Sequence, residues 1–192
     1  KITELFHRSE IKIPGLHNVE NYLTAIAATW GEVSLETMRS VAKNFGGVEH
    51  RIEFVRELDG VKYYNSSIDS SPSRTTAALS ALDKKPVIIC GGAEKGIGFE
   101  SLGPVLCQRA KSVILTGATA QKIKAALISH KDYTVDAIKI IEKPDFKDAV
   151  MAAHNEAKDG DTVLLSPACA SFDAFPNFEV RGNTFKEIIK NL

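Results

Sequence analysis

The chain has 192 residues, of which 44% are hydrophobic and 25% charged, a globular composition with room for one domain and part of a second. Lys plus Arg and Asp plus Glu both number 24, so the zero net charge gives no electrostatic reason to expect nucleic acid as a partner. No apolar run reaches the ~20 residues of a membrane-spanning helix, no signal peptide is recognisable, and three distant cysteines do not suggest a disulfide framework. We therefore expect a cytoplasmic monomer with no membrane insertion.

Two amphipathic helices are predicted in the first 45 residues, with no strand for them to cover. Apolar residues recur at helical spacing from Asn18 to Trp30 and again from Leu35 to Phe45. Ser34 is placed to cap the second helix, and Gly46-Gly47 to end it. Because apolar stripes need a partner, we expect this segment to be the end of a domain that packs on the next domain or on sequence outside this chain.

A β-hairpin is predicted to open the second domain. Its strands cover Arg51 to Leu58 and Val61 to Tyr64, joined at Asp59-Gly60, a dipeptide typical of a type I′ turn because both residues tolerate positive φ. A serine-rich loop then leads into a helix that begins with Pro72, where a missing N–H costs nothing.

Strand-like and helix-like runs alternate after this helix. The strand-like runs are almost wholly apolar, as in a parallel sheet covered by helices on both faces: PVIICGG, SVILTG, AIKIIE and DTVLLSPA. A final helix is expected from about Phe178 to Leu192. The sequence thus predicts an α/β fold, a Rossmann-like doubly wound and mostly parallel sheet over residues 47–192, preceded by a helical segment over residues 1–46.

Ligands of such sheets bind at the carboxyl ends of the strands, which selects four loops as candidates. These loops are Asn65 to Thr75, Gly91 to Gly96, Thr116 to Gln121 and Ser166 to Phe178. The first loop has five serines, runs into a helix and suits a carboxylate or phosphate. Alternatively, Ser70 and Ser71 only cap that helix, and Lys95 in the second loop is a solvated surface group.

Common nucleotide, metal and hydrolase motifs are absent. Gly91-Gly92 and Gly96 to Gly98 do not make G-x-G-x-x-G, because Ser101 stands where the third glycine belongs. The sequence contains no G-x-x-x-x-G-K-[ST], no G-x-S-x-G and no histidines at metal-ligand spacing. We predict no metal site within this chain.

Five stretches together resemble the Mur ligase family. They are PGLHNVEN (Pro14 to Asn21), GGVEHR (Gly46 to Arg51), YYNSSIDSSPSRT (Tyr63 to Thr75), ICGGAEK (Ile89 to Lys95) and LLSPACASFDAFPNFEVRGNTF (Leu164 to Phe185). The last stretch resembles the family member that adds D-glutamate more than the sister ligases or folylpolyglutamate synthase.

The resemblance implies a three-domain, ATP-dependent enzyme. Residues 1–46 would be the end of the central ATP-binding domain, and residues 47–192 the domain that binds D-glutamate. ATP and Mg²⁺ would convert the carboxylate of UDP-N-acetylmuramoyl-L-alanine to an acyl phosphate, which the amine of D-glutamate attacks during peptidoglycan synthesis. Since most of the ATP machinery would lie in other domains, we expect this chain alone to be inactive.

The resemblance also implies roles for individual residues. Ser70, Lys95, Ser171 and the backbone of Phe178 would bind the side-chain carboxylate of D-glutamate. The residues agree with this grouping, because one ammonium and several donors from three crevice loops would meet an anion there.

Five further positions are implied at the nucleotide. Asn18 and Asn21 would approach the adenine, although Asn18 alternatively caps its helix, and His50 and Arg51 would face the nucleotide. Ser66 stands where many members have an aspartate near the ribose, so the expected acidic group is missing there.

Two other classes of function remain open from the residues alone. A Rossmann-like module could bind a nucleotide or metabolite without chemistry, although the broken glycine pattern counts against a dinucleotide. A protein-interaction domain would leave the serine-rich loop without a ligand. Binding of D-glutamate near Lys95 and Ser171 would favour the ligase over both of these alternatives.

Overall fold

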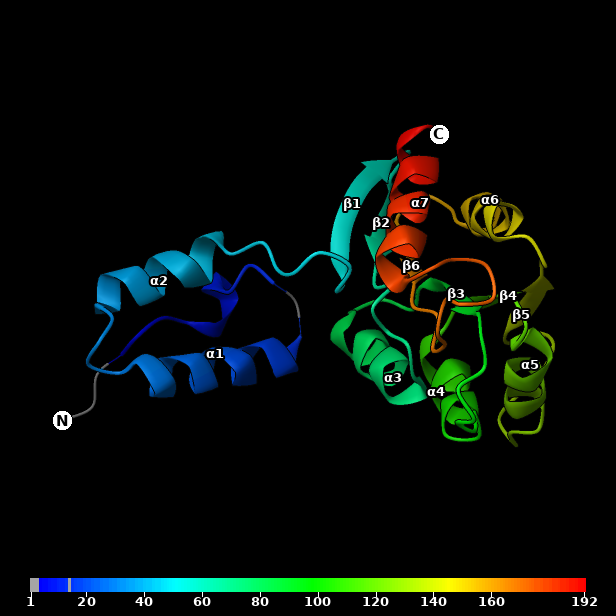
Figure 1. Cartoon of the computed structure of the whole chain (residues 1–192), viewed down its shortest axis with the longest axis horizontal. Helices are drawn as coiled ribbons and strands as arrows, with labels where there is room; N and C mark the ends of the chain where they lie inside the picture. Colours follow the sequence, from blue (N-terminus) through cyan, green and yellow to red (C-terminus); the bar gives the residue numbers. More distant parts are fainter. Residues whose placement is uncertain (1–3, 14) are drawn as a thin grey trace. The chain divides into compact units, whose positions relative to one another are not determined.

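The computed structural model describes residues 4–13 and 15–192, which belong to two compact units, Lys1–Val48 and Glu49–Leu192 (Figure 1). Residues 1–3 and the Pro14 of the PGLHNVEN stretch lie outside the described residues. The division between the units falls two residues after the domain boundary expected from the sequence, at residue 46.

In the described residues of the first unit, the structure has two α-helices and one short 3-10 helix. The 3-10 helix η1 spans Arg8–Glu10, α1 spans Leu16–Thr29 and α2 spans Leu35–Asn44. Ser34 caps α2 as predicted, because its hydroxyl oxygen accepts a hydrogen bond from the amide of Thr37.

The apolar stripes of these two helices are poorly buried. Among the described residues of the helices in this first unit, Met38 and Ala42 of α2 are buried. Leu23 is 60% exposed and Trp30, which follows α1, is 56% exposed. The helices therefore have apolar surface but little core of their own.

The second unit is built on a six-stranded sheet with the order β1-β2-β6-β3-β4-β5. β1 and β2 are antiparallel, and every other neighbouring pair is parallel. The strands are β1 (Glu53–Leu58), β2 (Val61–Asn65), β3 (Val87–Gly91), β4 (Ser112–Thr116), β5 (Lys139–Glu142) and β6 (Thr162–Leu165). The predicted mostly parallel sheet is confirmed.

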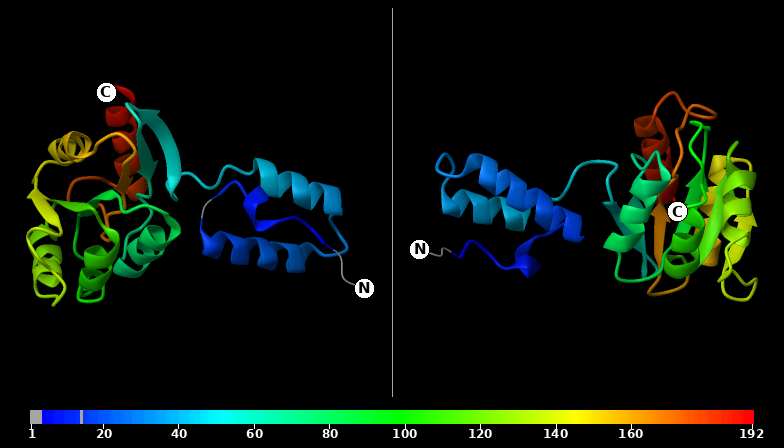
Figure 2. Two further views of the ribbon diagram at one scale, coloured as in Figure 1. Left: turned by 180° about the vertical axis from the view of Figure 1, so that it is seen from behind. Right: turned by 90° about the horizontal axis from the view of Figure 1, so that it is seen from below.

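Helices cover both faces of this sheet, so the fold is doubly wound (Figures 1 and 2). The helices are α3 (Pro72–Ala81), α4 (Leu102–Arg109), α5 (Ala120–Ile128), α6 (Phe146–Glu156) and α7 (Phe178–Lys190). One core lies between the sheet and α3, α4 and α5, and a second core lies between the sheet and α6 and α7. The predicted three-layer α/β architecture is confirmed.

The hairpin forms where the sequence places it. Asp59 and Gly60 both have positive φ, 50° and 74°, as a type I′ turn requires. β1 begins at Glu53, two residues later than predicted, because the preceding Ile52 has a left-handed φ of 48°. The chain before β1 is therefore a tight turn, which hydrophobic alternation does not indicate.

The crevice of the sheet lies around the carboxyl end of β6. β6 lies between β2 and β3, which lead into α3 and α4 on one face, whereas β6 leads into α7 on the other face. Neighbouring strands that send their chains to opposite faces leave a crevice at their carboxyl ends. The loops after β2, β3 and β6 therefore line one site.

Candidate functional site

Lys95 and Ser70 bring two of the predicted loops together. Lys95 follows β3, Ser70 follows β2, and the Lys95 ammonium donates to the Ser70 hydroxyl at 3.1 Å. Lys95 is exposed, so its ammonium has capacity for a further acceptor. Ser71 holds the N-cap position of α3, but its hydroxyl pairs with that of Ser73 at 3.2 Å and accepts from no backbone amide of the helix. The first loop thus presents hydroxyls beside a cation.

The loop that carries Ser171 lies directly against the loop of Lys95. Ala93 and Ala170 form an antiparallel bridge, in which the Ala93 amide donates to the Ala170 carbonyl at 2.9 Å. Gly92 permits this approach, because a Cβ there would lie 2.2 Å from the same carbonyl oxygen. Ser171 itself is 2% exposed. The second and fourth predicted loops therefore belong to one site.

Burial raises the pKa of Cys169 to about 11, and the hydroxyl of Thr119 and the charges of Arg181 and Lys95 oppose that rise. At neutral pH the buried thiol is protonated and therefore a poor nucleophile.

Phe178 begins α7 at the edge of the same site. Asn177 caps this helix by accepting from the amide of Val180 at 2.8 Å, which fixes the N-terminal end of α7, with its positive dipole, at the end of this loop. The Phe178 carbonyl accepts from the hydroxyl of Ser67 at 2.8 Å, which attaches the helix to the loop after β2. The structure thus gathers the four residues expected to bind the D-glutamate carboxylate, Ser70, Lys95, Ser171 and Phe178, on three adjoining loops.

Arg181 is a functional candidate that the sequence reasoning missed. It is 2% exposed, and its guanidinium donates to the Ser67 hydroxyl (3.0 Å) and to the carbonyls of Ser67 (2.9 Å), Ala170 (2.9 Å) and Cys169 (3.1 Å). Desolvation lowers its pKa to about 10, so the side chain stays charged at neutral pH. Arg181 therefore ties the loop after β2 to the loop after β6.

A signal for Arg181 was present in the sequence. Arg181, Phe185 and Ile189 are spaced four residues apart and all three are buried on one face of α7. A charged residue in the apolar stripe of a predicted helix is unusual, because burial of an unpaired charge is costly. A buried arginine at such a position therefore predicts several hydrogen-bond acceptors around its guanidinium group.

His50 is buried, and its ring orientation is set by β2. Asn65 Oδ1 accepts from the Ser67 amide at 3.1 Å, which turns the Asn65 NH2 group toward Glu53 Oε2 (3.0 Å) and His50 Nδ1 (2.9 Å). Glu53 also accepts from the His50 amide at 2.9 Å. Because Nδ1 faces the Asn65 NH2 group, which is a donor, Nδ1 acts as the acceptor and a neutral His50 ring carries its hydrogen on Nε2.

The turn around His50 is strained. His50 and Ile52 have positive φ values of 63° and 48°, which side chains rarely adopt and which cost about 1–3 kcal/mol each. Two contacts from the loop after β2 oppose this cost: the Ile52 amide donates to Ser66 Oγ at 3.1 Å, and the Ile68 amide donates to the His50 carbonyl at 3.3 Å. Arg51, between the two strained residues, is exposed.

Ser66 and the neighbouring Asp69 lie in the interior of the site. Ser66 is 0% exposed, so its hydroxyl serves the protein and not the surface. Asp69 is 6% exposed and accepts from Ser166 Oγ at 2.8 Å. Burial raises the pKa of Asp69 to about 6, and hydrogen bonds from Ser66 and Ser166 limit the rise. The sequence reasoning did not select Asp69 or Ser166.

Asn18 and Asn21 belong to the other unit, in the first turns of α1. The Asn21 amide donates to Asn18 Oδ1 at 3.3 Å. The N-cap of α1 is Gly15, so the alternative that Asn18 caps this helix is wrong. The helix starts two residues earlier than predicted, at Leu16, which moves Asn18 inside the first turn.

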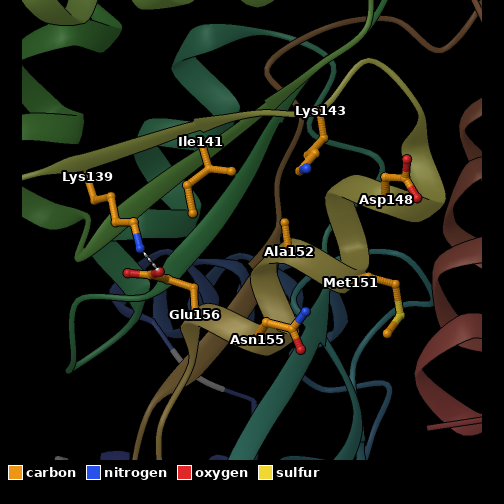
Figure 3. Close-up of a pocket in the computed structure, with 8 residues that line it drawn as sticks. All are labelled: Lys139, Ile141, Lys143, Asp148, Met151, Ala152, Asn155 and Glu156. Atoms are coloured by element: carbon orange, nitrogen blue, oxygen red, sulfur yellow. Dashed lines mark hydrogen bonds and ion pairs between the residues drawn. The ribbon is translucent and has the colours of Figure 1, made fainter.

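A separate cavity of about 480 Å³ lies between β5 and α6 (Figure 3). Lys139 of β5 and Glu156 of α6 form an ion pair beside it, 2.5 Å apart, and Lys143 points toward the same space. β5 is an edge strand, and β4 and β3 lie between it and β6. This cavity is therefore distinct from the crevice.

Within the described part of the chain, no three His, Cys, Asp or Glu side chains gather in a way that would hold a metal ion. No helix among the described residues is long and apolar enough to span a membrane.

The fold and its crevice define a doubly wound α/β domain in which hydroxyls, one exposed ammonium and a helix N-terminus meet. The family model for the Mur ligase glutamate ligase domain matches residues 50–169, and the chain belongs to the Mur ligase family.

Two similar relatives are both named UDP-N-acetylmuramoylalanine--D-glutamate ligase. The relative from Ruminiclostridium cellulolyticum is 52% identical, over 100% of this chain and 42% of its own length. The relative from Clostridium beijerinckii is 51% identical, over 98% of this chain and 41% of its own length. The chain thus spans about two fifths of these proteins.

Solved structures support the fold at lower sequence identity. A bifunctional folylpolyglutamate synthase/dihydrofolate synthase from Yersinia pestis aligns with a TM-score of 0.63 and 16% identity, covering 94% of this chain and 39% of its own. The murein peptide ligase mpl from Psychrobacter arcticus aligns with a TM-score of 0.56 and 21% identity, covering 93% and 38%.

Proposed function

We propose that this chain is the D-glutamate-binding part of an ATP-dependent ligase that joins D-glutamate to UDP-N-acetylmuramoyl-L-alanine in peptidoglycan synthesis. In this reaction ATP phosphorylates the carboxylate of the second substrate, the amine of D-glutamate attacks the acyl phosphate, and inorganic phosphate leaves. A cytoplasmic enzyme follows from the proposal, because ATP and nucleotide-linked sugars are found there. We also propose that it acts as a monomer.

The observation that carries this proposal is the meeting of Lys95, Ser70, Ser171 and the start of α7 on adjoining loops. A carboxylate needs a cation and several donors in fixed positions, and these groups supply both. The names of the relatives, at 52% and 51% identity, support D-glutamate as the amino acid.

Each unit has its own part in the proposal. We assign residues 1–46 to the end of an ATP-binding domain, with Asn18 and Asn21 toward the adenine, and residues 47–192 to D-glutamate, with His50 and Arg51 toward the nucleotide. The described residues offer no acidic cluster for Mg²⁺, so we place the binding of this ion in the rest of the enzyme. We expect this chain alone not to catalyse ligation.

The test uses the full-length protein that contains this chain. We expect ADP release that requires both D-glutamate and UDP-N-acetylmuramoyl-L-alanine and that L-glutamate does not support. In parallel, D-glutamate titrated into the 192-residue chain should shift the amide resonances of Ser70, Lys95, Ser171 and Phe178. An absence of D-glutamate-dependent ADP release would overturn the proposed activity, and shifts elsewhere would overturn the proposed site.

A further inference from the structure

Glu53 begins β1 with a carboxylate to which the roles proposed above assign nothing. Its oxygen Oε2 accepts from the His50 amide at 2.9 Å and from the side-chain amide of Asn65 at 3.0 Å. Its other oxygen, Oε1, lies 3.2 Å from the Lys186 ammonium. The carboxylate therefore joins the turn before β1, strand β2 and helix α7.

The contact with the His50 amide closes a turn whose backbone is strained. His50 is 4% exposed and has a φ of 63°, and Ile52 has a φ of 48°. Side chains keep such angles only where the surrounding structure imposes them, and a buried amide without an acceptor is costly. Glu53 supplies this acceptor three residues after His50, so its side chain closes the turn around Arg51 and Ile52.

The His50 ring lies between the same elements that the carboxylate joins. The side-chain amide of Asn65 that donates to Glu53 also donates to His50 Nδ1 at 2.9 Å. On the side of α7, the His50 ring meets the Phe178 ring edge-on, with the two centroids 5.9 Å apart. Glu53 therefore contacts both the backbone of His50 and the side chain that orients the His50 ring.

An ion pair with Lys186 would be a simpler explanation of Glu53. Lys186 also pairs with Glu49, so its ammonium keeps a partner when Glu53 is changed. The His50 amide, by contrast, then loses the acceptor that the structure gives it. The two explanations differ in the property of Glu53 that matters, which is either its charge or the oxygen that it places at the turn.

We propose that Glu53 is a positioning residue, which accepts from the His50 amide and so holds the turn of His50 and Arg51 in the conformation that meets the nucleotide. The inference rests on the proposed function for that nucleotide-facing role. Both oxygens of the carboxylate are occupied by groups of the protein, so Glu53 acts through the turn and not by contact with ATP.

The test compares Glu53→Met with Glu53→Gln in the full-length protein. Both substitutions remove the charge, but glutamine keeps an oxygen that can accept from the His50 amide, whereas methionine has only a weak acceptor. Glu53→Met should raise KM for ATP about tenfold, the value of one hydrogen bond to a charged acceptor, and leave KM for D-glutamate within about twofold. Glu53→Gln should keep both KM values within about twofold of wild type. Equal rises of KM for ATP in the two variants, or equal rises for both substrates in Glu53→Met, would overturn the proposal.

Two further variants separate the acceptor from the ion pair. Lys186→Met removes the ion pair and leaves the Glu53 oxygen at the turn, so KM for ATP should stay within about twofold of wild type. Glu57→Met is the matched control, because Glu57 is an exposed glutamate on the same strand. Lys186→Met and Glu53→Gln test the proposal even if Glu53→Met does not fold, since a rise of about tenfold in KM for ATP in either variant would overturn it.

Amide hydrogen exchange of the same proteins tests the turn independently of catalysis. The Ile52 amide donates to Ser66 Oγ at 3.1 Å, an acceptor that none of these variants changes, so its exchange reports opening of the turn. We expect exchange at Ile52 to quicken at least about tenfold in Glu53→Met and to stay within about twofold of wild type in Glu53→Gln and Glu57→Met. Unchanged exchange in Glu53→Met would overturn the proposal. If the wild-type protein shows no ligation, the proposed function fails, and exchange still decides whether Glu53 holds the turn.

Discussion

The His50 ring occupies the space that any side chain at Gly182 would need. A Cβ at position 182 would lie 2.3 Å from His50 Nδ1 and 3.0 Å from Asn65 Nδ2. Gly182 is buried in α7, where a glycine costs about 1 kcal/mol relative to alanine. The cost is explained by the close approach of α7 to the turn that carries His50.

The first prediction concerns Gly182→Ala. Although alanine favours helix, the methyl group must displace His50 or α7, and we expect a loss of about 1–3 kcal/mol in the free energy of unfolding. Urea denaturation of the 192-residue chain measures this loss. Gly46→Ala is the control, because a Cβ there meets nothing within 4 Å. A Gly182→Ala variant as stable as the wild type would show that the ring is not confined.

The arrangement of strands and helices was predictable because its signals are local. Apolar runs of strand length, the Asp59-Gly60 turn and Pro72 at the start of a helix each depend on a few neighbouring residues. The start of β1 was predicted too early because the positive φ of Ile52 is imposed by contacts with residues more than ten positions away.

The site was predictable only in part. Lys95 and Ser70 could be placed together, since both follow strands whose carboxyl ends meet. The buried side of the site could not, because Ser66, Asp69 and Arg181 have partners that only the tertiary fold brings within reach. A serine in a loop has the same local sequence signal whether its hydroxyl points inward or outward.

The second prediction concerns Lys95→Ala in the full-length enzyme. If Lys95 binds a carboxylate of D-glutamate, KM for D-glutamate should rise about 10- to 100-fold, as for loss of a charge-assisted hydrogen bond, while KM for ATP changes less than about twofold. Lys122→Ala is the matched control, because Lys122 is an exposed lysine paired with Glu94 in the loop of Lys95. In steady-state kinetics, both KM values of the Lys122→Ala control should stay near those of the wild type. Equal rises in KM for D-glutamate and for ATP in Lys95→Ala would contradict a specific role of Lys95 in binding D-glutamate.

The third prediction concerns Arg181→Met. The change keeps much of the side-chain volume but leaves the carbonyls of Ser67, Cys169 and Ala170 without their donor in a buried site. We expect a loss of about 2–4 kcal/mol in the free energy of unfolding of the chain, measured by urea denaturation. Arg109→Met, at an exposed position in the last turn of α4, should change it by less than about 0.5 kcal/mol. Similar effects of the two substitutions would mean that Arg181 does not join the loops.

The last prediction concerns pH and Asp69. Burial raises the pKa of this carboxyl from 3.8 to about 6, so between these values the folded chain binds more protons than the unfolded chain, and stability falls as pH rises. Above pH 7 the full cost is present, on the order of 3 kcal/mol. We therefore expect Asp69→Asn to gain stability relative to wild type between pH 4 and pH 7, as followed by urea denaturation at each pH. Because all other ionisable groups are shared, their contributions cancel in the difference between the two proteins. A difference that stays constant with pH would mean that Asp69 ionises as readily in the folded protein as in the unfolded chain, and one that shrinks as pH rises would mean that folding lowers its pKa; either result would contradict the prediction.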